Sequence, residues 1–485
     1  MCACNRSRGR PINPRHLFCL VALVSSLPAC ARSLYLFPEA AFVEDGSGGD
    51  SDEQVGDGVS SPEPWGRWTQ ALAIAPCAVG AELVVNTTGQ ELEGGSTLAD
   101  PANAGSTLSF VEAITIAVNR GGTNTILFDP AVFPIENPTP IQLDGTVSFP
   151  MSQAQGTCID GRGRGVVIEW SGGGDMPLSV WGLGTGSRMI GLTLLGVPFE
   201  ISVFDAEVAG CRIDTDGFAI RNAVNGRPWS LETTRSEFGP GNVMAGSTLR
   251  AWSDSIIHDS YFGVDPITRA TFESSTGIHA ESSHVKLTGC EFAVGYVGVD
   301  ANPGGFDPLF DFLASDNVFG PVTPGHGGVG LRIANHVGTL GPGNQFTGLE
   351  DGLFIMADAR MLVVENSFSV NSTGVRLFGP SALRRNTFHG NTTAAITSGL
   401  ALIAPELTTV SNNHVAGTCS VDGTIELFLD DAGQAGEYLG EAPCVAASGF
   451  SWDAGVGLAS GLAVTATLTD VTPQTSALSQ PVTIP

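Results

Sequence analysis

The sequence is poor in positively charged residues. Its 485 residues include 22 lysines and arginines against 49 aspartates and glutamates, which gives a formal net charge of −27, and Lys286 is the single lysine. A surface of this sign repels phosphate groups, so nucleic acid is excluded as a partner. Charged residues make up 15 % of the chain and hydrophobic ones 42 %, a balance that excludes an intrinsically disordered protein.

The chain also lacks several motifs that carry chemistry. After residue 29 no segment is apolar over the about 18 residues that a membrane-spanning helix requires. There is no Cys-x-x-Cys pair, no Gly-x-Ser-x-Gly, no phosphate-binding loop and no dinucleotide-binding fingerprint, which argues against a structural zinc site and several enzyme classes. We therefore expect no metal and no cofactor, and only calcium is left open.

Residues 1–29 have the features of an export signal, because arginines precede the short apolar run Leu17–Leu27. The run ends in Leu27-Pro28-Ala29-Cys30, which resembles the lipobox of bacterial lipoproteins, in which the cysteine is acylated. We therefore expect lipidation at Cys30 and an exported lipoprotein at the outer membrane or cell surface, with the lipid anchor as its only membrane contact. The alternative is simple secretion after cleavage behind Ala31, since small residues also flank that position.

From about residue 190 a short phrase recurs along the chain. Its clearest form is Asn-x-Phe, with asparagine intervals of 27, 22, 20 and 27 residues. The copies are Asn317-Val318-Phe319, Asn344-Gln345-Phe346, Asn366-Ser367-Phe368 and Asn386-Thr387-Phe388, with Asn413-His414-Val415 as a diverged copy. Upstream, the asparagine position is taken by Cys211, Ser236, Ser260 and Cys290. A second phrase, glycine followed by apolar, polar and apolar residues, predicts a strand with one buried face and begins at Gly298, Gly330, Gly352 and Gly374.

A self-similar unit of roughly 20–30 residues with two or three short strands predicts a solenoid, and its period of two excludes helical repeats. We predict an all-β parallel β-helix of about ten coils, stacked about 4.8 Å apart. Asparagines would then bond side chain to side chain at a turn, where asparagine also tolerates left-handed backbone. The buried aromatic column would contain Phe238, Phe262, Phe292, Phe319, Phe346, Phe368 and Phe388.

A resemblance to a known group comes from residues 108–114. Leu108-Ser109-Phe110-Val111-Glu112-Ala113-Ile114 resembles the Cys-Ser-Leu-Arg-Glu-Ala-Ile motif of exported bacterial β-helix proteins, with departures at Leu108, Phe110 and Val111. The coils behind it resemble the pectate-lyase-like superfamily, which implies a right-handed β-helix. Independently of the resemblance, apolar residues between Phe110 and Val118 fall at helical spacing behind Ser109 as N-cap, which predicts a short helix over the open end of the stack.

Six cysteines remain outside the signal and the lipid site. Cys419 pairs plausibly with Cys444, and Cys77 could pair with Cys158 across the N-terminal cap, as exported proteins permit. Cys211 and Cys290 are expected three coils apart in one turn position, beyond disulfide reach, as buried apolar residues.

The chain divides into five parts by composition and pattern. Glycine, aspartate and proline dominate the stretch before Trp65, which indicates a flexible acidic linker behind the lipid. Strand-like alternation after Cys419 indicates a small antiparallel module. The predicted parts are a signal peptide (1–29), a lipid-anchored acidic linker (30–66), an N-terminal cap with the first strands (67–164), the parallel β-helix (165–418) and a small β domain (419–485).

No motif identifies an active site on the coils. The best polar cluster lies within about one coil and supplies the catalytic candidates His258, Asp259, Asp265, Arg269 and His279, although such clusters are more often ordinary surface residues than catalytic ones. Trp229 and Trp252 are candidates for stacking on sugars if they point outward, and otherwise pack under loops.

Two functions therefore stay open. The first is a non-catalytic cell-surface lipoprotein that presents the β-helix for glycan binding or adhesion, with a polysaccharide or another surface component as partner. The alternative is a polysaccharide lyase or glycoside hydrolase with an unrecognised site on the outer face of the central coils, since this fold hosts both activities.

Overall fold

The computed structural model describes residues 74–485 except 79, 94, 144–154, 171–180, 196–200, 215–229, 247, 273–275, 281–283, 303–309, 324–326, 431 and 456. The expected signal peptide, the lipid site at Cys30 and the acidic linker lie outside the described residues, as does Trp229.

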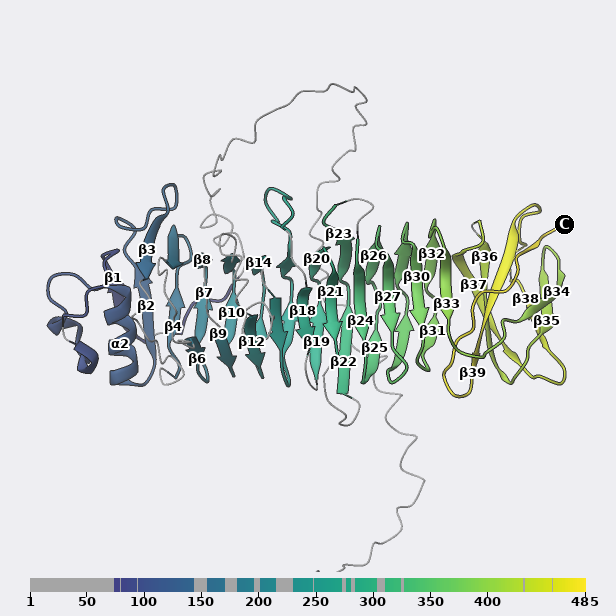
Figure 1. The fold of residues 1–485 in the computed structure, drawn as a ribbon, viewed down its shortest axis with the longest axis horizontal. Helices are drawn as coiled ribbons and strands as arrows, with labels where there is room; N and C mark the ends of the chain where they lie inside the picture. The colour runs from purple at the N-terminus through teal and green to yellow at the C-terminus, as the bar shows by residue number, and fades with distance from the viewer. Residues whose placement is uncertain are drawn as a thin grey trace, which may run out of the picture. The chain divides into compact units, whose positions relative to one another are not determined.

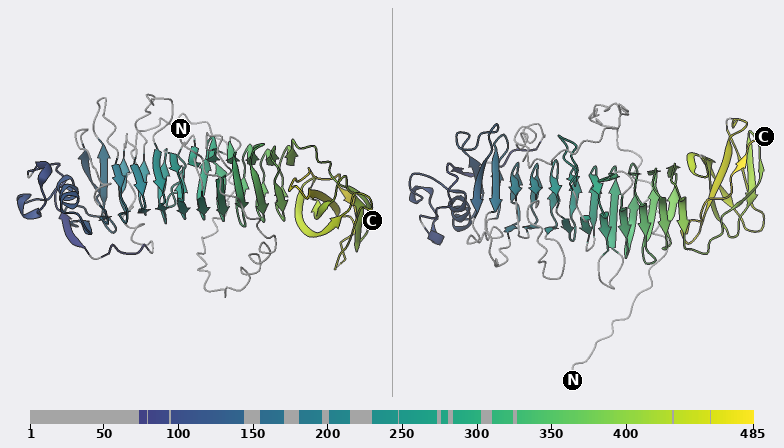
Figure 2. Two further views of the ribbon diagram at one scale, coloured as in Figure 1. Left: turned by 90° about the horizontal axis from the view of Figure 1, so that it is seen from below. Right: turned by 45° about the horizontal axis from the view of Figure 1, so that its top comes forward.

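Three long parallel sheets, here called A, B and C, make up most of the described chain (Figures 1 and 2). They contain 12, 11 and 10 strands. From β4 onward, successive strands pass from sheet A to B to C, so each turn of chain adds one strand to every sheet. Neighbouring strands pair in parallel, which confirms the expected parallel β-helix.

The strands of sheet A are β1 (Ala81–Val85), β2 (Asn124–Phe128), β4 (Cys158–Asp160), β7 (Arg188–Ile190), β10 (Glu207–Ala209), β13 (Glu237–Phe238), β16 (Ile256–His258), β19 (Val285–Thr288), β22 (Phe310–Ser315), β25 (His336–Leu340), β28 (Arg360–Val364) and β31 (Ala382–Arg384). Those of sheet B are β3 (Thr139–Leu143), β5 (Val166–Trp170), β8 (Thr193–Leu195), β11 (Arg212–Asp214), β14 (Val243–Ala245), β17 (Tyr261–Phe262), β20 (Glu291–Val294), β23 (Val318–Pro321), β26 (Gln345–Thr347), β29 (Ser367–Ser369) and β32 (Thr387–His389). Those of sheet C are β6 (Trp181–Leu183), β9 (Ile201–Phe204), β12 (Ser230–Thr234), β15 (Thr248–Ala251), β18 (Thr276–Ala280), β21 (Val297–Ala301), β24 (Val329–Ile333), β27 (Asp351–Ile355), β30 (Thr373–Leu377) and β33 (Ala394–Ser398).

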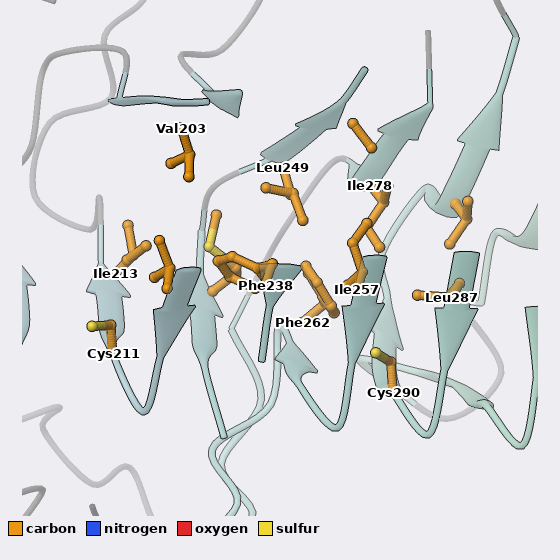
Figure 3. Packing of buried hydrophobic residues seen from close by; sticks show 14 of the residues in the cluster. Val203, Cys211, Ile213, Phe238, Leu249, Ile257, Phe262, Ile278, Leu287 and Cys290 are labelled. Atoms are coloured by element: carbon orange, nitrogen blue, oxygen red, sulfur yellow. The ribbon is translucent and has the colours of Figure 1, made fainter. Parts of the chain in front are cut away.

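Six of the seven predicted phenylalanines form one column inside sheet B. From Phe262 to Phe388 the rings lie parallel with centroids 4.6–5.1 Å apart. Phe238 does not belong to this column. It lies in sheet A, in register with Val208 and Ile257, and its ring is tilted by 35° against Phe262 (Figure 3).

The residue that precedes Phe262 in the column is Met244. The sequence pattern missed it because methionine replaces phenylalanine two positions after Asn242. Asn242 does occupy the expected turn position, where its Oδ1 accepts from the backbone N–H of Cys211 at 2.8 Å.

The asparagines form the expected ladder. Nδ2 of Asn317, Asn344 and Asn366 each donates to Oδ1 of the next asparagine, at 2.8, 2.9 and 3.0 Å, and the ladder ends at Asn386. The left-handed backbone, however, falls one residue earlier, with φ of +57° at Asp316 and +54° at Glu365. The residue before each of these asparagines thus adopts the left-handed conformation that turns the chain, and the asparagine side chain points into the turn.

The predicted continuation of the ladder at Asn413 is wrong, because this residue lies outside the parallel stack. Its neighbour His414 begins β35, which pairs antiparallel with β34 and β38. Instead, a second buried ladder runs from Asn371 to Asn391 and on to Gln434, with Nδ2-to-oxygen distances of 3.1 and 2.9 Å.

The glycine of the second repeated phrase makes room for the phenylalanine of the next coil. A methyl group on Gly330 would lie 2.8 Å from Cδ1 of Phe346, and one on Gly352 would lie 2.9 Å from Cδ1 of Phe368. Real Cβ atoms do not approach ring carbons that closely, so the aromatic column requires a glycine column beside it.

The predicted helix is present as α2 (Phe110–Arg120), beside β1 and β2 at the first end of the sheets (Figure 1). Ser109 accepts from the backbone N–H of Glu112, and the Glu112 carboxylate accepts from the backbone N–H of Ser109, which is a capping box. Phe110 is buried against Phe128, with ring centroids 5.9 Å apart. Two short 3-10 helices, η2 (Gly95–Thr97) and η3 (Pro101–Asn103), precede α2.

The other end of the stack meets two antiparallel sheets, which we call the C-terminal module. One contains β34 (Glu406–Val410), β35 (His414–Thr418) and β38 (Phe450–Asp453). The other contains β36 (Gly423–Asp430), β37 (Ala435–Cys444), β39 (Ala463–Asp470) and β40 (Val482–Thr483). Parallel pairing begins at β1, within the part expected to contain the cap and the first strands, and antiparallel pairing begins at Glu406.

Disulfides join Cys77 to Cys158 and Cys419 to Cys444, the two pairs expected from the sequence. Cys211 and Cys290 are unpaired and buried, also as expected. Burial raises the pKa of the Cys211 thiol to about 12 and also raises that of Cys290. Both thiols therefore stay protonated and unreactive.

Candidate functional site on the outer face of sheet C

The five catalytic candidates lie in one coil but on its three sides. His258 ends β16 in sheet A, and Asp259 follows it. Asp265 and Arg269 lie in the loop after β17 of sheet B, whereas His279 lies in β18 of sheet C. Residues that are close in a β-helix sequence diverge because each coil turns through three faces, so these five do not converge on one site.

His258 and Asp259 do contact each other. Nδ1 of His258 lies 2.9 Å from Oδ2 of Asp259, and Nε2 lies 2.9 Å from Oε1 of Glu237. The hydrogen bond that His258 donates to Asp259, followed by the one to Glu237, raises the pKa of His258. An imidazole held by two carboxylates favours its charged form and is a poor general base.

Asp265 binds an arginine that the sequence reasoning missed. Nη1 of Arg212 donates to Oδ2 of Asp265 at 3.0 Å, and Nη2 donates to Asp214 at 3.3 Å. The other oxygen of Asp265 accepts from the backbone N–H groups of Ile267 and Thr268, so it also holds its own loop together. Arg269 pairs separately with Glu291 on the same sheet.

His279 belongs to a longer arrangement, which we call the sheet C column. Side chains at one register position of sheet C point away from the buried face, since strand residues alternate between faces. The registers of β15 to β30 align them from coil to coil. The column contains Arg250, His279, Asp300, Arg332, Phe354 and Arg376.

Asp300 is the centre of the first ion-pair network in the column. Nε of Arg332 donates to Oδ1 of Asp300 at 2.9 Å, Nη2 donates to Oδ2, and Nδ1 of His279 lies 3.5 Å from the same Oδ2. Burial raises the pKa of Asp300, but the hydrogen bonds from His279 and Arg332 outweigh it and lower the pKa. The carboxylate is therefore ionised and held in place from both neighbouring coils.

A second network follows after Phe354. Arg376 donates to Oδ1 of the buried Asp351 from Nε at 3.2 Å and from Nη2 at 2.8 Å. Between the two networks, the ring of Phe354 meets that of Phe378 edge to face, with centroids 5.6 Å apart. Phe378 is 45 % exposed, so the column offers an aromatic surface flanked by fixed polar groups.

Trp252 lies at the first end of the column, immediately after β15. The guanidinium of Arg250 covers its ring at 5.8 Å from the centroid. Its Nε1 is buried and has no acceptor within the described part of the chain. The indole is half-buried and already occupied on one face, so Phe354 and Phe378 form the more open aromatic surface.

The two carboxylates on the outer side of sheet C that bind arginines, Asp300 and Asp351, lie two coils apart and three residues out of step, so their Cα atoms are about 14 Å apart by strand geometry. Each of these two also binds an arginine, so neither is a free acid or base.

Sequence reasoning did not select Asp300, Phe354 or Arg376 as functional residues. The signal was nevertheless present, because each of them occupies the polar position of the second repeated phrase, two residues after its glycine. A repeat that aligns buried residues also aligns the outward residue between them.

Among the described residues, no cluster of three or more histidine, cysteine or acidic side chains could hold a metal ion. Over the same residues, none of the helices combines the length and apolarity needed to cross a membrane.

Solved structures with a similar fold include phage tailspike proteins. The full-length tailspike protein 2 of Escherichia coli O157:H7 bacteriophage CAB120 is 9 % identical, with a TM-score of 0.28, and the match covers 79 % of this chain and 61 % of that one. A double mutant of the tailspike of E. coli bacteriophage HK620 is 10 % identical over 76 % of this chain and 91 % of that one, with a TM-score of 0.25. A further mutant of that protein, in complex with a pentasaccharide, is 11 % identical over 73 % and 87 %, also with a TM-score of 0.25.

The chain thus spans about three fifths of the CAB120 protein, as its 61 % coverage states. No protein-family model and no curated protein matches the sequence.

Proposed function

We propose that this protein is a non-catalytic exported lipoprotein that binds cell-surface glycans on the sheet C column. The observation that carries the proposal is the ion-paired Asp300 and Arg332 beside the ring of Phe354. Sugar sites combine fixed groups that hydrogen-bond hydroxyls with an aromatic ring that covers the apolar face of the sugar. The column provides both, and it repeats the polar part at Asp351 and Arg376.

The charge of the column favours a neutral glycan. Arg332 is neutralised by Asp300 and Arg376 by Asp351, while the whole chain carries −27. An anionic polysaccharide would meet repulsion at long range and find no free arginine in these two pairs. Hydroxyl groups, by contrast, can donate to the carboxylates and accept from the guanidinium groups.

A glycan array followed by calorimetry tests this proposal. For a glycan that binds, Phe354→Ala should weaken the affinity at least tenfold, because the sugar can no longer stack on the aromatic ring. Asp300→Asn should weaken it similarly, since Arg332 is released from its fixed position. The matched control is Glu291→Gln, which removes a carboxylate paired with Arg269 on sheet B. Absence of any bound glycan, or equal affinity in all three variants, would overturn the proposal.

The alternative, a polysaccharide lyase or glycoside hydrolase, is favoured by one observation on sheet B. Asp214 and Asp265 both bind Arg212, so two carboxylates and an arginine meet beside sheet B, although Asp265 comes from a coil two turns after that of Asp214. Turnover of a polysaccharide panel with and without calcium distinguishes the two functions. Activity that Asp265→Ala abolishes, and Glu291→Gln retains, would favour the enzyme.

The anchor is a separate part of the proposal. Cys30 behind the apolar run supports acylation, which would make this a surface lipoprotein with a lipid-only membrane contact. Incorporation of a labelled fatty acid should occur in the natural chain and be absent in Cys30→Ser. Release of the unlabelled natural chain into the medium would instead indicate cleavage behind Ala31.

We also place the chain with the exported β-helix group of the Cys-Ser-Leu-Arg-Glu-Ala-Ile motif. Support comes from the serine and glutamate of the motif, because Ser109 and Glu112 form the capping box that starts α2. The positions that depart from the motif leave this capping function untouched.

A further inference from the structure

The outer face of sheet A carries a row of exposed apolar side chains. Ile256, Leu313 and Leu362 are 44 %, 46 % and 41 % exposed. The strand registers align them at one outward position of β16, β22 and β28. Since consecutive coils lie about 4.8 Å apart, the three side chains recur at every second coil, about 9.6 Å apart. We call them the apolar row, and such an alignment indicates an interaction surface.

The coils between them place hydrogen-bond donors in the same row. Lys286 of β19 lies between Ile256 and Leu313, and Thr339 of β25 lies between Leu313 and Leu362. The ammonium and hydroxyl groups can donate to carbonyl oxygens, while the aliphatic stem of the lysine extends the apolar surface. A partner on this row therefore needs an apolar side chain about every 9.6 Å, with unpaired acceptors between them.

Acidic side chains flank the apolar row. Exposed acids lie two residues before or three residues after its members, namely Asp254, Asp259, Asp311, Asp316 and Glu365. They outnumber the basic residues Lys286 and Arg360 on the outer side of β19 and β28, and Arg385, which pairs with Glu365. A second copy of this surface, or an anionic lipid surface, would meet charge of the same sign. The charge favours a basic partner.

The period of the row selects the conformation of that partner. In a polyproline-type helix, three residues make one turn and advance about 9.3 Å, and the backbone carbonyls have no internal hydrogen bonds. An α-helix repeats a face after about seven residues, or 10.5 Å, and its carbonyls are already bonded. Over the about 19 Å from Ile256 to Leu362, the polyproline period stays within about 1 Å of the row, whereas the α-helix drifts by about 2 Å.

We propose that the outer face of sheet A binds an extended basic segment of another protein in the polyproline conformation. Apolar residues at every third position of the segment lie on Ile256, Leu313 and Leu362. Its lysines or arginines reach the flanking acids, and Lys286 and Thr339 donate to its carbonyls. This surface lies on a different sheet from the sheet C column, so peptide and glycan bind independently.

Calorimetry with a synthetic peptide tests the proposal on the full chain. The probe is an acetylated peptide of four Leu-Pro-Lys repeats, because proline favours the extended conformation and leucine then recurs at every third residue. It should bind saturably at one site. Four Leu-Pro-Glu repeats reverse the charge, and four Leu-Pro-Lys-Gly repeats keep the charge but change the leucine period. Both control peptides should bind at least tenfold more weakly. No saturable binding of the probe up to about 1 mM, or equal affinity for the two lysine peptides, would overturn the proposal.

Variants locate the peptide on sheet A. Leu313→Ser should weaken binding of the probe at least tenfold, because the central apolar contact is lost. Asp316→Asn should weaken it about threefold at low salt, since an exposed charge pair is weak and screened by salt. The matched controls are Val318→Ser on sheet B, where Val318 is 39 % exposed, and Glu437→Gln, which removes an exposed acid in β37. Both controls should retain the natural affinity, and equal losses in all four variants would contradict the placement.

Sedimentation of the natural chain checks for a different occupant. A dimer that Leu313→Ser separates, and that Val318→Ser leaves intact, would show that a second copy covers the apolar row, which would also overturn the proposal. A monomer that binds the probe through Leu313 supports it.

Discussion

The two halves of the sheet B column solve the same packing problem with different residues. In the first half the column contains Ile141, Ile168, Leu194, Ile213 and Met244. In the second half every member from Phe262 to Phe388 is phenylalanine, and the turn beside it carries the asparagine ladder from Asn317 onward. Identical side chains stack on one another only when each coil repeats the register of the last, so the second half is the more regular.

The first half has other means of support. There Arg162 and Arg188 donate to the backbone carbonyls of residues 74–76, and the Cys77–Cys158 disulfide joins residues 81 apart in sequence. The comparison teaches that a parallel stack can be held either by repetition within the core or by a disulfide and hydrogen bonds to a segment outside the coils.

The largest expected effect is removal of one ring from the middle of the stack. Phe346→Ala should lower the free energy of unfolding by about 4 kcal/mol, because a buried ring is replaced by a cavity and both neighbouring rings lose a partner. Ile213→Ala at the same column position of the first half should cost less, about 3 kcal/mol. Denaturant unfolding followed by circular dichroism measures both. A larger loss for Ile213→Ala would contradict the assigned importance of aromatic stacking.

The first half should depend more on its disulfide. Replacing Cys77 and Cys158 by serine should destabilise it by about 3 kcal/mol, since a long loop is no longer closed in the unfolded chain. Hydrogen exchange should then speed up in β2, β4 and β7 before it changes in β26 to β32. The corresponding double serine variant of Cys419 and Cys444 is the control, and uniform acceleration in both variants would remove the distinction between the halves.

Asn366→Ala tests how much the asparagine ladder contributes to the stability of the second half. Nδ2 of Asn366 donates to Leu340, Val364 and Asn386, so truncation leaves several buried groups without partners. We expect a loss of about 3 kcal/mol. Asn366→Ser should lose less, because Ser260 fills the same position in an earlier coil. A serine variant as unstable as the alanine variant would show that only asparagine is tolerated there.

The smallest effect concerns the end of the second half, where the C-terminal module begins. Glu426 is buried beside Arg384, at 4.0 Å, and accepts from the backbone N–H of Arg385. Burial raises its pKa from 4.5 to about 7 despite the nearby Arg384. The folded state then binds the proton more tightly than the unfolded state, so the contribution of Glu426 to stability is greatest below about pH 4.5 and is lost as the pH rises from there through about 7.

Glu426→Gln cannot ionise and should flatten this dependence between pH 5 and 8. Glu441, the cross-strand neighbour of Glu426, provides the control, since Glu441→Gln leaves the buried carboxyl in place. An unchanged slope in Glu426→Gln would show that another group titrates.

The fold was predictable from the sequence because its main interactions repeat. Phenylalanines and asparagines that align in space also recur in the chain, which is why Phe319 and Asn344 could be assigned before any coordinates. The prediction was wrong at Phe238 and at Asn413, where the residue type matches the repeat but the strand does not occupy the expected position in the stack. A three-residue phrase does not state which of the three sheets its strand joins.

The site was less predictable for a related reason. Proximity in sequence grouped His258 with His279, whereas the coil places them on different sheets. The sheet C column joins residues 21 to 32 positions apart, such as Asp300 and Arg332, and these become neighbours only through the stacking of coils. Pairing of a carboxylate with an arginine in the next coil has no local pattern.

The close fit of each glycine to the ring one coil ahead has a consequence for how such a molecule changes length. Gly330 makes room for Phe346, and Gly352 makes room for Phe368. A phenylalanine inserted without its glycine would therefore clash with the neighbouring side chain. Excision of residues 344–365, one full period, would join Gly343 to Asn366 and keep every ring opposite a glycine. Growth and shortening therefore proceed by whole turns of chain, and a protein of this kind can adjust its reach while its interior remains unaltered.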